Sequence, residues 1–139
     1  MDKGSYILFL QVDSNVNLKT KARSWELKPG TYAYIGSGMG GLTSRVKRHL
    51  IGGKKNHWHI DFLLPHAKVL GALLLPSNKR EEDFWSVFVG EYSVEVVEGF
   101  GSSDRDTVTN LYRLKDEELE KMLTNILRKR REINDCFHE

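Results

Sequence analysis

The segment from Tyr34 to His49 constrains the fold of this chain more than any other part of its sequence. It reads Tyr-Ile-Gly-Ser-Gly-Met-Gly-Gly-Leu-Thr-Ser-Arg-Val-Lys-Arg-His, so an apolar aromatic run leads into a stretch rich in glycine. Glycine frees the backbone for a tight loop, and Leu42, Val46 and Leu50 follow at the spacing of one helix face. The segment therefore predicts a strand, a loop and a helix over about 42–50. The loop is either a structural turn or an anion site at the helix N-terminus.

The other patterns predict one α+β domain over residues 1–139, with a small mixed or antiparallel sheet flanked by helices. Further strands are expected at 5–12, 31–36, 69–75, 92–98 and 108–114, and further helices at about 79–89 and 116–132. Residues 69–75 are predicted to form a buried central strand. The helix at 79–89 should turn Phe84, Trp85 and Phe88 inward, and the last helix should pack on the core through Leu119, Met122, Leu123, Ile126 and Leu127.

The distribution of charge indicates the kind of partner. Residues 27–60 contain six Lys or Arg side chains and no acid. A concentrated positive field favours a polyanion such as DNA or RNA, although a solvated basic face gives the same pattern. The candidate nucleic-acid contacts are Lys47, Arg48, Lys54 and Lys55.

The setting of the chain is predicted from what its sequence lacks. No apolar run approaches the roughly 20 residues of a membrane helix, and the first residues do not resemble a signal peptide. The single cysteine, Cys136, excludes a disulfide within the chain. A cytoplasmic location is therefore expected.

Four side chains are candidates for phosphodiester chemistry. Antiparallel pairing of 5–12 with 31–36 would bring Tyr6 and Tyr34 together, and Arg45 and His49 lie one helical turn apart. Arginine stabilises the charge that develops on a phosphate, whereas tyrosine and histidine can move a proton. Packing tyrosines, a surface arginine and a half-buried histidine are the alternative reading.

Two sets of neighbouring residues could hold a metal ion. Glu81, Glu82 and Asp83 lie at the start of a predicted helix, where negative charge also stabilises the helix dipole. In an extended segment His57, His59 and Asp61 would share one face, which suits either a transition metal or a hydrogen-bonded corner.

Taken together, these motifs resemble the GIY-YIG endonuclease superfamily. Gly4-x-Tyr6, Tyr34-Ile35-Gly36 and Arg45-x-x-x-His49 have the order and approximate spacing of that fold, over residues 4 to 112. The Tyr-Ile-Gly-Ser-x-x-Gly-Gly-Leu and His-Trp-His-Ile-Asp patterns are similar to a largely uncharacterised archaeal and bacterial branch.

The resemblance implies a DNA endonuclease, in repair or DNA processing, that uses one divalent ion, Mg²⁺ or Mn²⁺. It implies that Tyr6 activates or orients water, that Tyr34 lines the pocket, that Arg45 stabilises the phosphorane and that His49 assists proton transfer. The metal ligand it implies is Glu81, with Glu82 as the second choice. The chain departs from the branch at Ser5, where isoleucine is usual, and at positions that usually hold two cysteines and a Ser-His pair, which here are Arg105, Thr107, Thr109 and Asn110.

Two other functions fit the same residues. A catalytically inactive nucleic-acid-binding module would keep the basic surface of 27–60 without a carboxylate near Arg45. A metal-binding scaffold would instead use His57, His59 and Asp61.

Overall fold

A computed structural model of the chain describes residues 1–52, 58–101 and 109–138, with side chains as far as Ile133. Its centre is a five-stranded antiparallel sheet in the order β5-β1-β4-β7-β6, and a separate two-stranded sheet pairs β2 with β3. The strands are β1 (Gly4–Val12), β2 (Val16–Lys19), β3 (Ser24–Leu27), β4 (Gly30–Ser37), β5 (Lys68–Pro76), β6 (Ser93–Val96) and β7 (Leu111–Leu114). The helices are α1 (Leu42–Ile51), α2 (His59–Leu63), α3 (Glu82–Gly90) and α4 (Leu119–His138), with short 3₁₀ turns at Leu64–His66 and Asp116–Glu118.

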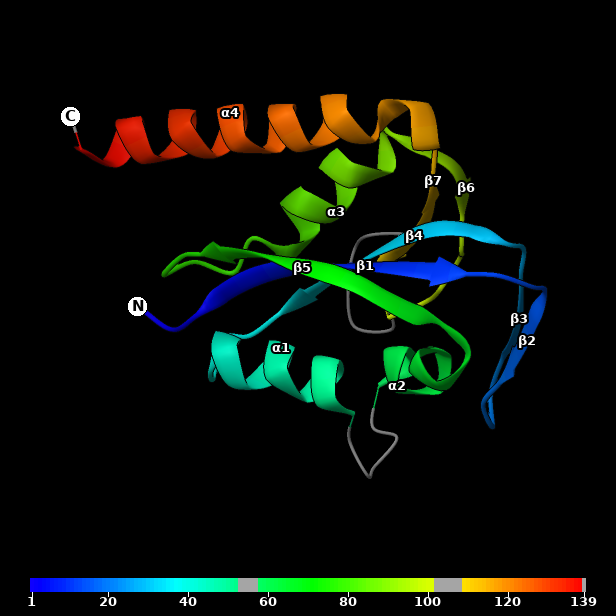
Figure 1. Ribbon diagram of the computed structural model, residues 1–139. Coiled ribbons are helices and arrows are strands. Elements are labelled where there is room, and N and C mark those ends of the chain that lie inside the picture. Colours follow the sequence, from blue (N-terminus) through cyan, green and yellow to red (C-terminus); the bar gives the residue numbers. More distant parts are fainter. Residues whose placement is uncertain (53–57, 102–108, 139) are drawn as a thin grey trace.

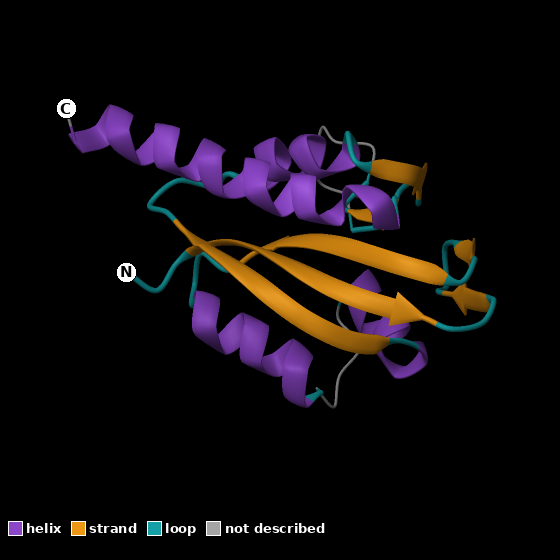
Figure 2. Cartoon of the chain, turned by 45° about the horizontal axis from the view of Figure 1, so that its top comes forward, coloured by secondary structure: helices purple, strands orange, loops and turns teal. Residues whose placement is uncertain are grey.

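Helices cover both faces of the large sheet. Helices α3 and α4 lie on one face, and α1 and α2 lie on the other (Figures 1 and 2). Side chains of a strand alternate between the faces, so Tyr6 and Leu8 join the cluster beneath α1 and α2, whereas Ile7 packs with Trp85 and Met122 beneath α3 and α4. The predicted α+β class is confirmed, and within the described residues every strand pairing is antiparallel.

The register of β1 on β4 brings the two tyrosines together. Tyr6 lies opposite Gly36, and Leu8 lies opposite Tyr34. The rings of Tyr6 and Tyr34 have centroids 6.3 Å apart. The antiparallel pairing predicted from the sequence is therefore confirmed.

Several predicted details are wrong. Strand β5 is at the edge of the sheet rather than its centre, and its Leu70 is 51% exposed. In α3, Trp85 is buried but Phe84 is 42% exposed. Leu50 is also exposed, because His49 occupies the buried position at the end of α1.

The remaining differences concern the hairpin and the last helix. The β2–β3 hairpin was not predicted, since its four-residue strands are too short for a clear alternation. Helix α4 packs on the core through Leu119, Met122 and Ile126, as predicted, whereas Leu123 and Leu127 are exposed. Within the described ranges, no helix has both the length and the apolar character needed to span a membrane.

Candidate active site

The site begins with a glycine opposite a tyrosine. Gly36 of β4 is the cross-strand partner of Tyr6, and a Cβ atom at position 36 would overlap the phenol ring. The ring of Tyr6 therefore crosses its neighbouring strand only because residue 36 has no side chain. The Tyr-Ile-Gly sequence thus positions Tyr6 as well as shaping the loop that follows.

Tyr6 meets His49 of α1 in a buried contact. The Tyr6 hydroxyl and His49 Nε2 are 2.7 Å apart, and His49 is 3% exposed. Nδ1 of His49 has no hydrogen-bond partner among the described residues. The pair is compatible with proton donation by the phenol to Nε2 or by Nε2 to the phenol. In either form it links a strand and a helix through groups that exchange protons.

Burial keeps both members of this pair neutral. It lowers the pKa of His49 to about 4, in the same direction as the charges of Arg45 and Arg48 and against that of Asp61. Burial also raises the pKa of Tyr6 and of Tyr34 well above the ordinary value, and the charge of Arg45 opposes both shifts. At neutral pH the site therefore contains an uncharged imidazole and protonated phenols beside a guanidinium.

Two arginines of α1 share one indole. The guanidinium carbons of Arg45 and Arg48 lie 4.1 and 4.3 Å from the ring centroid of Trp58, which precedes α2. Arg48 Nη2 also donates to Asp61 Oδ2 at 3.0 Å. Arg48, a predicted nucleic-acid contact, is therefore partly engaged by the carboxylate of α2.

The two adjacent glutamates face different groups. Glu81 Oε1 lies 3.5 Å from Arg130 Nη1 of α4, so its side chain turns away from the tyrosines. Glu82 is 5% exposed, and its charge raises the pKa of both Tyr6 and Tyr34. Its burial and its electrostatic effect on both phenols therefore favour Glu82, the second choice from the sequence, as the acid of the site.

The predicted triad of His57, His59 and Asp61 is not supported. His57 lies outside the described residues, and His59 and Asp61 belong to helix α2 rather than to an extended segment. In a helix, side chains two positions apart point in different directions. His59 Nδ1 accepts from the amide of Gly101, and Asp61 accepts from the amide of Trp58 and from Arg48.

The residues predicted to contact nucleic acid are only partly within the described ranges. Lys47 is exposed on α1. Lys54 and Lys55 lie outside the described residues, as do Arg105 and Thr107. Among the positions where the chain departs from the branch, Thr109 is buried, and its hydroxyl bonds to backbone carbonyls of the sheet region.

The N-terminus of α1 is occupied by a side chain of the protein. Asp2 Oδ1 accepts from the amide and the hydroxyl of Thr43, at 2.8 and 2.6 Å, and the Asp2 carbonyl accepts from the amide of Leu42. These bonds satisfy donors that an anion would otherwise use. The glycine loop is therefore a structural turn followed by a capped helix.

Sequence reasoning missed Trp58 and Asp2 as parts of this region. Trp58 was not among the candidate site residues, and it is 36% exposed beside two arginines. The available signal was a tryptophan that follows five Lys or Arg side chains in residues 45–55. Asp2 gave no signal, because it acts across 41 positions of sequence.

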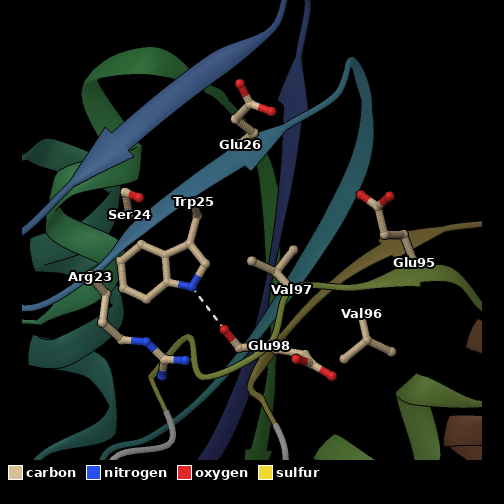
Figure 3. A pocket seen from close by; sticks show the side chains of 8 residues that line it. All are labelled: Arg23, Ser24, Trp25, Glu26, Glu95, Val96, Val97 and Glu98. Carbon is tan, nitrogen blue, oxygen red and sulfur yellow. Dashed lines mark hydrogen bonds between the residues drawn. The ribbon is translucent and has the colours of Figure 1, made fainter.

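A surface hollow in the described part of the chain lies elsewhere (Figure 3). It has a volume of about 460 Å³. One side is formed by residues 23–26, which include the start of β3, and the other side by residues 95–98, at the end of β6 and just after it. The lining includes Arg23, Trp25 and Glu98, and the indole of Trp25 donates to the carbonyl of Glu98 at 2.8 Å. None of the predicted site residues lines this hollow. The reactive groups are thus concentrated at Tyr6 and not in the hollow.

Comparison with known protein families identifies the family of this chain. A family model described as a domain of unknown function, DUF123, matches residues 5–132. The match includes Tyr6, Tyr34, Arg45, His49 and Glu82. No curated protein and no solved structure matches the chain.

Proposed function

The chain belongs to the family described as a domain of unknown function, DUF123, and we propose that it is a metal-dependent DNA endonuclease of the GIY-YIG type. Its reaction is the hydrolysis of a phosphodiester bond, in DNA repair or processing. The observation that carries the proposal is the buried 2.7 Å contact between the Tyr6 hydroxyl and His49 Nε2. The positive charge of Arg45 lowers the pKa of the same phenol against the effect of burial, so a cation acts on one member of the Tyr6–His49 pair.

The neutral pair suits removal of a proton from water. The oxygen of Tyr6 accepts a proton from the attacking water while the phenol proton passes to His49 Nε2. The raised pKa of Tyr6 keeps the phenol protonated before the reaction. A bound phosphate would offset the positive charges of Arg45 and Arg48, which lower the pKa of His49. Substrate binding therefore makes His49 a better base.

Arg45 suits the other half of the reaction. The water oxygen bonds to phosphorus, one ester P–O bond breaks, and the products are a phosphomonoester and a hydroxyl. Negative charge develops on the non-bridging oxygens in the transition state. A guanidinium with fixed position stabilises that charge more than it stabilises the substrate, and Arg45 is held on Trp58 beside Tyr6.

The residues present fit one divalent ion rather than a protein-enclosed metal centre. In the part of the chain that the structure describes, no group of three His, Cys, Asp or Glu side chains gathers to hold a metal. Mg²⁺ is commonly held by one or two carboxylates with phosphate oxygens and water. Glu82 is a single carboxylate that acts electrostatically on Tyr6. When bound there, Mg²⁺ or Mn²⁺ would polarise the phosphate and stabilise the leaving oxygen.

The test is a cleavage assay on labelled linear and branched DNA with Mg²⁺ or Mn²⁺. Tyr6→Phe, Arg45→Ala and Glu82→Gln should each reduce cleavage by at least about 100-fold, the scale of one lost proton-transfer group or oxyanion donor. Glu81→Gln is the matched control, because Glu81 faces Arg130, and it should cut at nearly the wild-type rate. Thermal unfolding of each variant shows whether it is folded.

The same assay distinguishes a nuclease from its rival, a module that only binds nucleic acid. Retarded but uncut DNA with every metal would favour an inactive nucleic-acid-binding module, whose affinity should fall steeply with salt. Loss of cleavage in Glu81→Gln with full activity in Glu82→Gln would reverse the choice of acid.

A further inference from the structure

We propose that Trp58 is a positioning residue for Arg45 and that the ion pair of Arg48 with Asp61 holds Trp58 in place. This inference rests on the proposed function and assigns a role to a residue that does not react. Its basis is a set of four side chains from α1 and the start of α2, joined by contacts of 3.0 to 4.3 Å.

The stacking leaves the reactive edge of Arg45 available. Arg45 places its guanidinium carbon 4.1 Å from the centroid of the Trp58 ring. A guanidinium stacks through its planar face and donates hydrogen bonds from its edges. Arg45 can therefore remain on the indole and still interact with the phenol of Tyr6 or with a phosphate.

A fixed arginine is of more use to the reaction than a mobile one. An arginine side chain loses considerable rotamer freedom when it is ordered. Contact with Trp58 supplies that ordering before substrate arrives, as preorganised electrostatic stabilisation requires. Trp58 is 36% exposed, so it is not a core residue, and its indole contacts two arginines at the surface.

Asp61 explains how two cations can share one ring. Arg48 lies 4.3 Å from the same centroid, so two positive groups meet at Trp58. Asp61 Oδ2 accepts from Arg48 Nη2 and from the backbone amide of Trp58, both at 3.0 Å. One carboxylate thus offsets the second cation and fixes the backbone of the residue on which both stack.

The experiment is a double-mutant cycle with wild type, Arg45→Ala, Trp58→Ala and the double variant. Single-turnover cleavage with Mg²⁺ or Mn²⁺ and affinity for labelled DNA without metal are measured for all four proteins. Trp58→Ala should slow cleavage about tenfold or more in wild type and cause little further loss in the Arg45→Ala background. Trp58→Phe, which keeps an aromatic face, should restore most of the rate.

Each result decides the matter. Equal losses from Trp58→Ala in both backgrounds would overturn the positioning role and leave a structural one. If the wild-type protein binds DNA but does not cut it, the nuclease proposal fails and the affinity cycle decides the role of Trp58. Coupling of the two residues in DNA affinity then supports positioning, and independent effects overturn it.

Discussion

The two faces of the central sheet differ in what they bury. Beneath α3 and α4 the core is mainly apolar, and its hydroxyl groups bond to each other, as Ser86 does to Tyr112 at 2.9 Å. Beneath α1 and α2 the core includes an imidazole with a pKa lowered to about 4. Buried ionisable groups cost stability unless they are compensated. The comparison teaches that the face beneath α3 and α4 supports the fold chiefly by apolar packing, while the face beneath α1 and α2 buries Tyr6 and His49 of the candidate site, to which α3 adds Glu82.

The largest expected effect on stability is on the α3–α4 face. Ile126→Ala removes a fully buried side chain of α4, and such truncations cost about 2–5 kcal/mol. Chemical denaturation should show this loss, whereas activity per folded molecule should persist because Ile126 is on the face opposite Tyr6 and His49. Leu127→Ala is the control on the same helix, since Leu127 is 59% exposed. Equal losses in the two variants would contradict the assignment of α4 to the core.

The second prediction concerns the sheet face beneath α1 and α2, where one substitution should reduce both stability and activity. Gly36→Ala places a methyl group where the ring of Tyr6 lies. We expect a loss of about 1–3 kcal/mol from overpacking, together with loss of cleavage as the phenol moves from His49. Gly40→Ala is the matched control, because a Cβ there meets no atom within 4 Å. The smaller side chain of Tyr6→Leu should recover stability, but not activity, in the Gly36→Ala background. Unchanged stability in Gly36→Ala would show that the ring has another place to go.

The third prediction concerns how the stability of the protein depends on pH through the buried His49. His49 has a native pKa of about 4 against an ordinary value of 6.5. The unfolded chain therefore binds a proton before the native one does, and stability falls as the pH drops from about 6.5 to about 4. The native state keeps its full contribution from neutral His49 above that window. Below it both states are protonated and the loss is complete.

Comparison of wild type with His49→Gln isolates this effect. The pKa of His59 is also lowered, through burial, but His59 is present in both proteins. Urea unfolding at several pH values should show a weaker decline for His49→Gln between about pH 6.5 and 4. Parallel curves for the two proteins would mean that His49 is not held neutral in the native state.

The pair of tyrosines could be predicted because each lies in a short apolar run typical of a strand. Antiparallel pairing of 5–12 with 31–36 brings them together, and the helix after the glycines implied that Arg45 and His49 approach the same point. These features depend on short-range periodicity, which a single sequence carries.

The sequence could not choose between Glu81 and Glu82. Adjacent residues of a helix differ by about 100° in direction, so a small error in where α3 begins exchanges their positions. The choice depends on Arg130, which lies 49 positions away and pairs with Glu81. The same argument applies to His59 and Asp61, where the start of a five-residue helix decided whether two side chains shared a face.

The smallest expected effect is at the start of α1, where Asp2 bonds to Thr43. These hydrogen bonds lower the pKa of Asp2, so its stabilisation is present above the ordinary value of 3.8 and is lost as the pH falls through the lower native value. Asp2→Asn should reduce the melting temperature slightly near pH 7, and added salt should narrow the difference from wild type because the site is exposed. Asp13→Asn is the control, since Asp13 bonds only to Gln11 among the described contacts and caps no helix. Because α1 carries Arg45 and His49, Asp2→Asn should lower the cleavage rate by a larger fraction than Asp13→Asn does, and equal rates would show that the position of α1 does not depend on its cap.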